Sequence, residues 1–326
     1  MRWWVGPARL RSLGILGMNC RNLDFIGRYN PRRLYPLVDD KLKTKVLAER
    51  EGIPVPKLHF ALREQFRVKR IGEMLRPLTG FAVKPAKGSG GRGILVIQGQ
   101  ENGVYVKTSG RRLDLEDIKR HISNILAGLY SLAGTPDVAI VEELIELDQR
   151  FAGFSHEGIP DIRVIVFRGY PVMAMLRLAT HESDGKANLH QGAVGVGLDI
   201  ATGRCLLAVQ HSLPLKVHPD TGADFSRLKI PDWPEILTLA ARCHAMTNLG
   251  YLGADIVLDR RRGPLVLELN ARPGLAIQMA SDHGLLSRLR QLENLRSRHA
   301  TVAQRVEFAM ASFGQGRGGR ARSSED

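Results

Sequence analysis

Oxygen-bearing side chains interrupt two short apolar runs toward the C-terminal end of the sequence. Asp255 lies in the run Ala-Asp-Ile-Val-Leu-Asp, and Glu268 and Asn270 lie in the run Pro-Leu-Val-Leu-Glu-Leu-Asn. Carboxylate and amide oxygens are hard ligands, which suit Mg²⁺ shared between a protein and nucleotide phosphates better than they suit zinc. These residues therefore predict a divalent-cation site.

A charged Arg-Arg-Arg-Gly turn separates the two runs and predicts a β-hairpin. We place the centre of this turn between Arg261 and Arg262. Asp255 then faces Glu268 directly across the ladder, and Asn270 points to the same face. Two facing carboxylates repel each other, and a bound cation would remove this repulsion. The alternative is an exposed hairpin whose acids are solvated.

A glycine-rich loop is the second chemical feature. It follows a strand that carries Lys84 and precedes an apolar strand at residues 94–97. Glycines let backbone N–H groups approach phosphate oxygens, and Lys84 adds a positive charge. The loop therefore predicts a phosphate cover, although neither a Gly-Lys-Ser/Thr end nor a following helix marks it as a known nucleotide fingerprint. The alternative is a flexible hairpin loop.

Two arginines lie inside apolar strands that flank a Gly-Tyr turn. Arg163 is near the start of the first strand and Arg177 is late in the second. A guanidinium group in such a place needs an anionic partner, which a phosphate or a substrate carboxylate provides. Buried ion pairs with Glu143 or Glu268 are an alternative that is compatible with this function.

Polar residues and glycines then fill a long loop at residues 180–199. The length of the loop predicts a functional role, with Asn188, His190 and Gly192 as candidate contacts. His190 could act as a base or serve as a structural hydrogen-bonding group.

Helices and a further strand must position these groups. Leu42, Val46 and Leu47 recur at helical spacing in an amphipathic helix that ends at Gly52. Its Lys41 either points into a site or is solvated. A second helix begins at residue 114 and is expected to continue to residue 132. The strand that follows, at residues 136–146, is suited to adenine, because backbone groups can bind the edge of the base while apolar side chains cover its ring.

Composition limits the class of protein. The chain has 326 residues, 44% of them hydrophobic, which predicts a globular protein of one lobed domain or two domains. No apolar run reaches membrane-spanning length and no signal peptide is recognisable, so we expect a cytoplasmic protein. Cys20, Cys205 and Cys243 are too scattered for a disulfide framework or a cysteine metal site.

The net charge of +14 is concentrated toward the two ends. The Gly-Arg-Ser segment 313–326 predicts a disordered tail, and nucleic-acid binding by it is a less favoured hypothesis. The basic segment 1–35 carries Trp3, Trp4, Leu10 and other apolar residues, which favour packing on the body of the protein over peripheral contact with a membrane. Homo-oligomerisation is left open.

The order of these motifs resembles the ATP-grasp superfamily, and within it the RimK-like α-L-glutamate ligases. The resemblance covers residues 35–285 approximately. It rests on Lys41, Lys84 with its glycine loop, the Val-Glu-Glu-Leu-Ile strand, Asp161-Ile-Arg, Arg177, Asn188-Leu-His-Gln-Gly, Gly253-Ala-Asp, and Glu268-Leu-Asn-Ala-Arg-Pro-Gly.

The resemblance implies an α+β fold whose two lobes grip ATP, with the usual N-terminal α/β domain reduced or absent. It places a glycine-loop lobe at residues 58–141 and a metal-binding lobe at residues 142–312 of an ATP-grasp domain that spans residues 36–312. Asp255, Glu268 and Asn270 would hold Mg²⁺, with two ions expected and Mn²⁺ as a substitute. The residues that would bind ATP are Lys41, Lys84, Gly88, Ser89, Gly90, Gly91, Glu142, Glu143, Leu144, Ile145 and Asp148.

The implied activity is that of a carboxylate–amine ligase. A substrate carboxylate attacks the γ-phosphate of ATP, and an amine, from glutamate or another amino acid, then opens the acyl phosphate to form an amide. Arg177 would stabilise the transferred phosphoryl group, while Arg163 and Asn188 would line the acceptor side. An ATP-binding scaffold of the same fold is the alternative.

Two features depart from the glutamate ligases. Arg272 stands where those ligases carry a small residue, and we expect it to join Arg163 and Arg177 in an interior basic pocket. The run 211–233 lacks a clear counterpart there and is closer to ATP-grasp proteins associated with sugar transfer. The sequence therefore leaves the substrate open.

Overall fold

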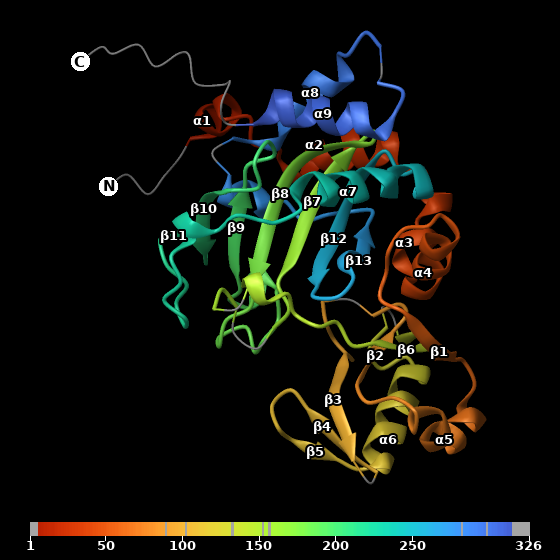
Figure 1. Cartoon of the computed structure of the whole chain (residues 1–326). Coiled ribbons are helices and arrows are strands. Elements are labelled where there is room, and N and C mark those ends of the chain that lie inside the picture. Colours follow the sequence, from red (N-terminus) through yellow and green to blue (C-terminus); the bar gives the residue numbers. More distant parts are fainter. Residues whose placement is uncertain are drawn as a thin grey trace. The chain divides into compact units, whose positions relative to one another are not determined.

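The computed structural model describes residues 6–88, 90–101, 103–131, 134–151, 153–155, 158–281, 283–297 and 299–314. The chain divides into two compact units, which Figure 1 shows with their helices and strands labelled. The first unit comprises Met1–Tyr35 and Leu147–Asp326, and the second comprises Pro36–Glu146. The described part of the N-terminal segment thus belongs to the same unit as the predicted metal hairpin.

The second unit is built on a six-stranded sheet of the order β1-β6-β2-β3-β4-β5, and every pairing in it is antiparallel. Phe81, Val83 and Ile97 of its strands join Ile118 and Ile122 of helix α6 in one buried cluster. The strands are β1 (Leu58–Leu62), β2 (Phe81–Pro85), β3 (Leu95–Glu101), β4 (Val104–Lys107), β5 (Arg112–Leu113) and β6 (Ala139–Glu143).

Helix α6 spans Leu115–Leu126 and begins with a capping box between Asp114 and Asp117. It ends six residues earlier than the predicted position 132 because Gly128 adopts a left-handed φ of +85°. The amides of Gly128 and Leu129 then bond back to carbonyls of the last turn, which is a regular way to terminate a helix. In the described part of this unit, the remaining helical segments are α3 (Pro36–Asp39), α4 (Lys41–Arg50), η3 (Gln65–Arg70) and α5 (Ile71–Leu75).

Helix α4 is the predicted amphipathic helix, but its buried face differs from the prediction. Asp40 caps it by accepting hydrogen bonds from the amides of Leu42 and Lys43. Val46, which we expected in the core, is 55% exposed, whereas Lys45 is buried. A lysine can occupy a buried position only if an anion compensates its charge. For Lys45 this anion is the carboxylate of Glu142 on β6.

The first unit is built on a seven-stranded antiparallel sheet of the order β11-β10-β9-β8-β7-β12-β13. Two antiparallel sheets with flanking helices confirm the predicted α+β class. The strands are β7 (Asp161–Phe167), β8 (Tyr170–Leu178), β9 (Val194–Leu198), β10 (Cys205–Gln210), β11 (Leu213–Leu215), β12 (Tyr251–Asp259) and β13 (Gly263–Asn270).

Helix α7 (Trp233–Thr247) packs across β7, β8, β12 and β13, as Figure 1 shows, and α9 (Val302–Phe313) packs on α7 and β8. Side chains alternate along a strand. Asp161 and Arg163 on β7, and Asp255 on β12, therefore face away from the apolar residues next to them in each strand. The other helical segments are α1 (Pro7–Ser12), α2 (Met18–Cys20), η1 (Arg21–Gly27), η2 (Arg32–Leu34), η5 (Gln149–Phe151), η6 (Leu189–Gln191), η7 (Phe225–Arg227), η8 (Ala276–Ala280) and α8 (Leu285–Glu293).

The two ends of the chain carry the predicted C-terminal tail and the basic N-terminal segment that was expected to pack on the body of the protein. Helix α9 ends at the buried Phe313, while positions 315–326 of the predicted tail lie outside the described residues, as do Trp3 and Trp4. Leu16 of the N-terminal segment is buried, but Leu10 and Leu13 are exposed. Among the described residues, no helix combines the length and the hydropathy needed to span a membrane.

Candidate functional site

The β12–β13 hairpin places Asp255 opposite Glu268, as predicted, and it pairs Gly253 with Asn270. The predicted centre of the turn was wrong, because Asp259 pairs with Gly263 and the loop is therefore centred on Arg261. The carboxylate of Asp259 accepts hydrogen bonds from two loop amides, and Gly263 supplies the positive φ of +71° that closes the loop.

A β-bulge restores the predicted register at the site. Ile256 pairs with Val266, whereas Asp255, one residue earlier, pairs with Glu268, so Leu267 is the extra residue. Without the bulge, Asp255 would face Leu267. The bulge therefore brings the two carboxylates opposite each other.

Two arginines bind the carboxylate of Asp255. Arg163 donates to both of its oxygens, with 2.7 Å between Arg163 Nη2 and Asp255 Oδ2. Arg177 donates from Nη2 to Asp255 Oδ2 at 2.8 Å and from Nε to Asp161 Oδ1 at 2.6 Å. The structure thus pairs the two arginines with Asp255 and Asp161, neither of which the sequence predicted as their partner.

Burial and charge act in opposite directions in this group. Burial alone would raise the pKa of Asp255, but Arg163 and Arg177 hold it below its usual value. Burial raises the pKa of Asp161 to about 6. The positive charge of Arg177, which donates a hydrogen bond to Asp161, offsets only part of that effect. Burial alone would lower the pKa of Arg177, but Asp161 and Asp255 raise it, so the guanidinium stays charged.

The donor set at this end of the hairpin fits a hard divalent cation. Asp255, Glu268 and Asn270 offer oxygen atoms from adjoining register positions, and Glu268 and Asn270 are only partly buried. Within the described residues, Oδ1 of Asp255 accepts from Arg163 alone, which leaves one lone pair for a metal. Among the described residues, no group of three His, Cys, Asp or Glu side chains could hold a metal ion, and the third ligand of this set is an amide.

The glycine loop joins β2 to β3 in the second unit, and these strands pair as an antiparallel hairpin. Gly90 and Gly91 have φ values of +63° and +75°, and no atom lies within 4 Å of the Cβ that another residue would place there. Lys41 Nζ donates to the carbonyl of Gly88 at 2.6 Å. The predicted contact Ser89 lies outside the described residues.

Lys84 is paired with the carboxylate of Glu142, a residue that the sequence predicts to bind adenine through its backbone. Its ammonium group forms an ion pair with Glu142, and Lys45 binds the other oxygen of the same carboxylate at 2.9 Å. Burial alone would raise the pKa of Glu142, but the two lysines lower it, while burial lowers the pKa of Lys45. Lys45 was not predicted as a functional residue, although its position four residues after Lys41 places both lysines on one side of a helix.

The predicted adenine strand is β6, which lies between β1 and β2. Glu142 pairs with residues on both neighbours, and the amide of Glu143 donates to the carbonyl of Lys57 at 2.8 Å. Leu144 and Ile145 follow the end of the strand and are partly buried. The segment past Glu143 therefore offers backbone groups outside the sheet ladder.

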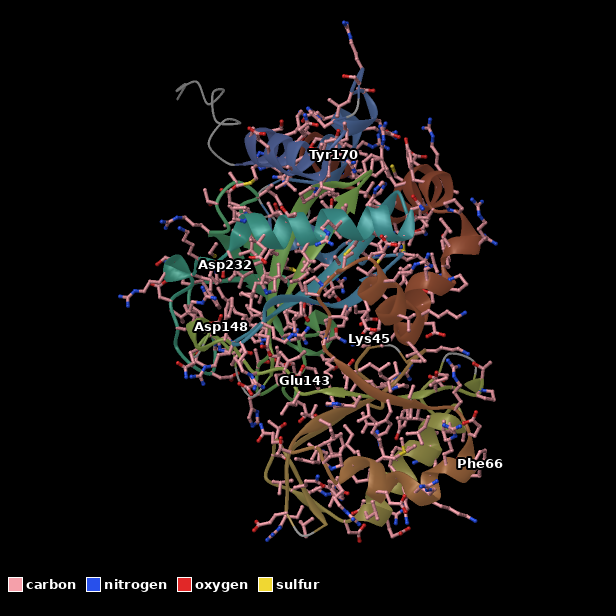
Figure 2. All side chains as sticks on the ribbon, turned by 45° about the vertical axis from the view of Figure 1, so that its right-hand side comes forward. Lys45, Phe66, Glu143, Asp148, Tyr170 and Asp232 are labelled. Carbon is pink, nitrogen blue, oxygen red and sulfur yellow. The ribbon has the colours of Figure 1, made fainter. Side chains whose placement is uncertain are left out.

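Asp148 belongs to the first unit, unlike the other predicted nucleotide contacts. Its carboxylate binds Arg150 through two side-chain nitrogens, and Arg150 Nη2 also lies 3.3 Å from Asp232 (Asp148 and Asp232 are labelled in Figure 2). Hydrogen bonds from Arg150 lower the pKa of Asp148, so it is an anion at neutral pH.

Asn188 and His190 lie in the loop between β8 and β9. Asn188 caps the short helix η6 by accepting from the amide of His190, and the side chain of His190 is exposed. Gly192 follows with a φ of +96°, and its carbonyl accepts from Thr180 Oγ1 and Gln210 Nε2. The structure thus gives this loop a defined conformation.

The run that departs from the glutamate ligases supports this loop. His218 is fully buried, and its Nε2 lies 3.1 Å from the carbonyl of Ala179. Asp220 accepts from the amide of His181 at 2.7 Å, and His211 lies 2.9 Å from Glu182. These contacts connect residues 211–220 to the start of the loop that carries Asn188.

The N-terminal segment holds the open end of the metal hairpin, next to Asn270. The buried amide of Asn30 donates to the carbonyls of Tyr251 and Ala271 and accepts from the amide of Tyr251. Arg21 donates to the carbonyl of Pro273. Arg272 is exposed and lies over the ring of Tyr35, so the prediction that it lines an interior pocket was wrong.

Known proteins resemble the chain over most of its length. Among curated proteins, a probable alpha-L-glutamate ligase of Maridesulfovibrio salexigens is 25% identical over 275 residues, covering 83% of this chain and 65% of the relative. A probable alpha-L-glutamate ligase of Xanthomonas oryzae pv. oryzae is 27% identical over 257 residues, covering 78% of this chain and 64% of the relative. The chain thus spans somewhat less than two thirds of these relatives' length.

Among solved structures, the D-cycloserine synthetase DcsG aligns with a TM-score of 0.47 and 17% identity over 88% of this chain and 79% of its own. The D-alanyl-alanine synthetase A of Vibrio cholerae aligns with a TM-score of 0.46 and 11% identity, over 86% of this chain and 66% of its own. The family model described as sugar-transfer-associated ATP-grasp matches residues 20–294. The predicted resemblance is therefore confirmed, and the chain belongs to the sugar-transfer-associated ATP-grasp family.

Proposed function

We propose that this protein is a Mg²⁺- and ATP-dependent ligase that joins a carboxylate to an amine. The observation that carries the proposal is the charged face of the larger sheet, where Arg163 and Arg177 meet Asp255 opposite Glu268. Such a face combines cationic groups for a transferred phosphoryl group with oxygen ligands for the metal that accompanies it.

Nucleotide binding is assigned to the residues that the sequence predicts for it. Lys41 and Lys84 with Gly88, Ser89, Gly90 and Gly91 would bind the phosphates, while Leu144 and Ile145 would contact adenine past the end of β6. Glu142 acts through its ion pairs with lysines, and its backbone lies within the sheet ladder. Glu143 and Asp148 complete the proposed set. ATP-grasp proteins use ATP with a divalent metal, and Mg²⁺ on Asp255, Glu268 and Asn270 would neutralise phosphate charge.

The reaction consists of two displacements. An oxygen of the substrate carboxylate attacks the γ-phosphorus of ATP, the bond to ADP breaks, and an acyl phosphate forms. The amine then attacks the carbonyl carbon, phosphate leaves, and the amine loses a proton as the amide forms. Arg177 would stabilise negative charge on the phosphoryl oxygens, and Arg163 and Asn188 would orient the acceptor.

The names of the curated relatives support a class of substrate. The curated relatives are named probable alpha-L-glutamate ligases, which supports an amino acid such as glutamate as one substrate. The run 211–220 supports the loop that carries Asn188, so we assign differences in acceptor choice to this part of the first unit.

An ADP-release assay tests the proposal. The purified chain is incubated with ATP and pooled amino acids, with and without Mg²⁺, and with added carboxylate acceptors. We expect ADP release that requires Mg²⁺ and a substrate, and that falls on the order of 100-fold in Arg177→Gln. Arg70→Gln, which changes an arginine that is 78% exposed on the second unit, should retain full activity. Tight ATP binding without turnover would instead support a scaffold.

A further inference from the structure

Glu142 is a buried carboxylate that lies between two lysines. Its side chain is 5% exposed, that of Lys45 is 7% exposed and that of Lys84 is 13% exposed. Lys84 on β2 and Glu142 on β6 lie diagonally across the ladder on one face, because Ala82 is the direct partner of Glu142. Helix α4 packs on this face, with Leu42 beside Ile140, and so brings Lys45 to the same carboxylate.

The two lysines differ in what else they can do. Lys45 (labelled in Figure 2) also donates to the carbonyl of Pro56, so its ammonium group is held from two sides inside the unit. Lys84 is the more exposed of the two and lies on the strand that leads into the glycine loop. Lys84 can therefore turn toward a ligand, whereas Lys45 cannot leave Glu142 without giving up both of these contacts.

A buried carboxylate is stable in its ionised form only while a neighbouring cation compensates its charge. Removing one partner of a buried ion pair leaves an uncompensated charge, which is strongly unfavourable. If Lys84 were the sole partner of Glu142, binding of a phosphate by Lys84 would leave Glu142 unpaired. Glu142 would then compete with the nucleotide for Lys84.

We propose that Lys45 is a positioning residue for nucleotide binding: it keeps Glu142 compensated and in place, and this allows Lys84 to exchange Glu142 for a nucleotide phosphate. The proposal rests on the nucleotide-binding part of the proposed function. Lys45 acts entirely through Glu142 and does not touch the ligand. Its effect must therefore disappear when Glu142 loses its charge.

Calorimetric titration of the full chain with a non-hydrolysable ATP analogue and Mg²⁺ tests this inference. We expect Lys45→Met to weaken binding by about tenfold or more, because Glu142 retains Lys84. Glu142→Gln leaves Lys45 without its anion, so its fold is checked by a melting curve, but the folded variant should bind at least as tightly as the unchanged protein because no carboxylate competes for Lys84. The double variant Lys45→Met/Glu142→Gln should match Glu142→Gln within about twofold, because the neutral amide no longer holds Lys84. Lys43→Met, at an exposed lysine of the same helix, is the matched control and should bind normally.

The outcomes separate this inference from the ligase proposal. Unchanged binding in Lys45→Met, or a double variant as weak as Lys45→Met, would overturn it. If Lys45→Met does not fold, as judged by its melting curve, the comparison of Glu142→Gln with the double variant still decides, since equal affinity supports the inference and unequal affinity overturns it. An unchanged protein that binds the analogue without turnover would contradict only the ligase. One that binds no nucleotide would overturn both.

Discussion

Asp255 and Glu268 share a register position but have different surroundings. Asp255 is 3% exposed and bound by two arginines, whereas Glu268 is partly buried at the edge strand of the sheet. Changing Asp255 would leave buried guanidinium groups without their anion, so its metal function cannot be separated from its structural function. Glu268 is therefore the better position at which to test the metal.

We expect Glu268→Gln to lower Mg²⁺-dependent turnover on the order of 100-fold and to raise the Mg²⁺ concentration needed for half-maximal activity. The fold should be retained, because the substitution removes a repulsion with Asp255 and keeps the size of the side chain. Activity titrations with Mg²⁺, together with a melting curve, measure both effects. Full activity at ordinary Mg²⁺ would contradict the metal assignment, and an unfolded variant would show that Glu268 is needed for structure.

The raised pKa of Asp161 leads to a second prediction, which concerns how the stability of the protein depends on pH. This pKa is raised to about 6 from an ordinary value of 3.8, so the folded protein binds this proton more tightly than the unfolded chain does. The resulting stability is fully present below about pH 3.8 and is lost as the pH rises through about 6. Relative to Asp161→Asn, the unchanged protein should therefore lose about 2 kcal/mol of unfolding free energy between pH 4 and pH 6.5. Urea unfolding at each pH measures this difference, and parallel curves would contradict it.

At the scale of elements, the loop between β8 and β9 takes its shape from residues 211–220. The amide of His181 and the carbonyl of Ala179 both bond to side chains of this run, Asp220 and His218. The run therefore acts as a support for the loop that carries Asn188. A protein that lacked it would have to hold the loop by other contacts.

Asp220→Ala should loosen this loop. The amide of His181 would lose its acceptor, and a hydrogen bond of ordinary strength corresponds to about a fivefold change in an opening equilibrium. We expect hydrogen–deuterium exchange in peptides covering residues 181–192 to accelerate by about that factor, with a weaker apparent affinity for the acceptor and unchanged ATP affinity. Asp224→Ala, which removes the cap of η7 in the same run, is the control. Equal exchange in both variants would rule out the support.

The elements also show what the sequence could reveal. Alternating residues and the Arg-Arg-Arg-Gly turn predicted Asp255 opposite Glu268, although the predicted centre of the turn was wrong. The bulge at Leu267 and the turn centred on Arg261 were not predictable. Each of them shifts the register of the hairpin, and the two shifts cancel at Asp255 and Glu268. Lys45 was missed because the identity of its partner, Glu142, depends on how a helix packs on a sheet formed by distant strands.

For the whole molecule, the described part of the N-terminal segment is a component of the first unit. Asn30 ties the start of β12 to Ala271, the residue that follows the predicted ligand Asn270. The arginines of this segment include Arg21, which binds the carbonyl of Pro273. The basic character of this end of the chain therefore includes a structural role beside the metal hairpin, which composition alone could not reveal.

The C-terminal arginines provide the last test of what the charge of +14 does. Deleting residues 315–326 removes Arg317, Arg320 and Arg322 but keeps α9 and its buried Phe313. Because the proposed site uses none of the deleted residues, ligase kinetics and ATP affinity should stay within about twofold of the full chain. If nucleic acid were the partner, its binding would weaken steeply with salt, and the deletion would reduce the slope by about one unit for each lost phosphate contact. Loss of turnover on deletion would show that the proposed site is incomplete without the tail.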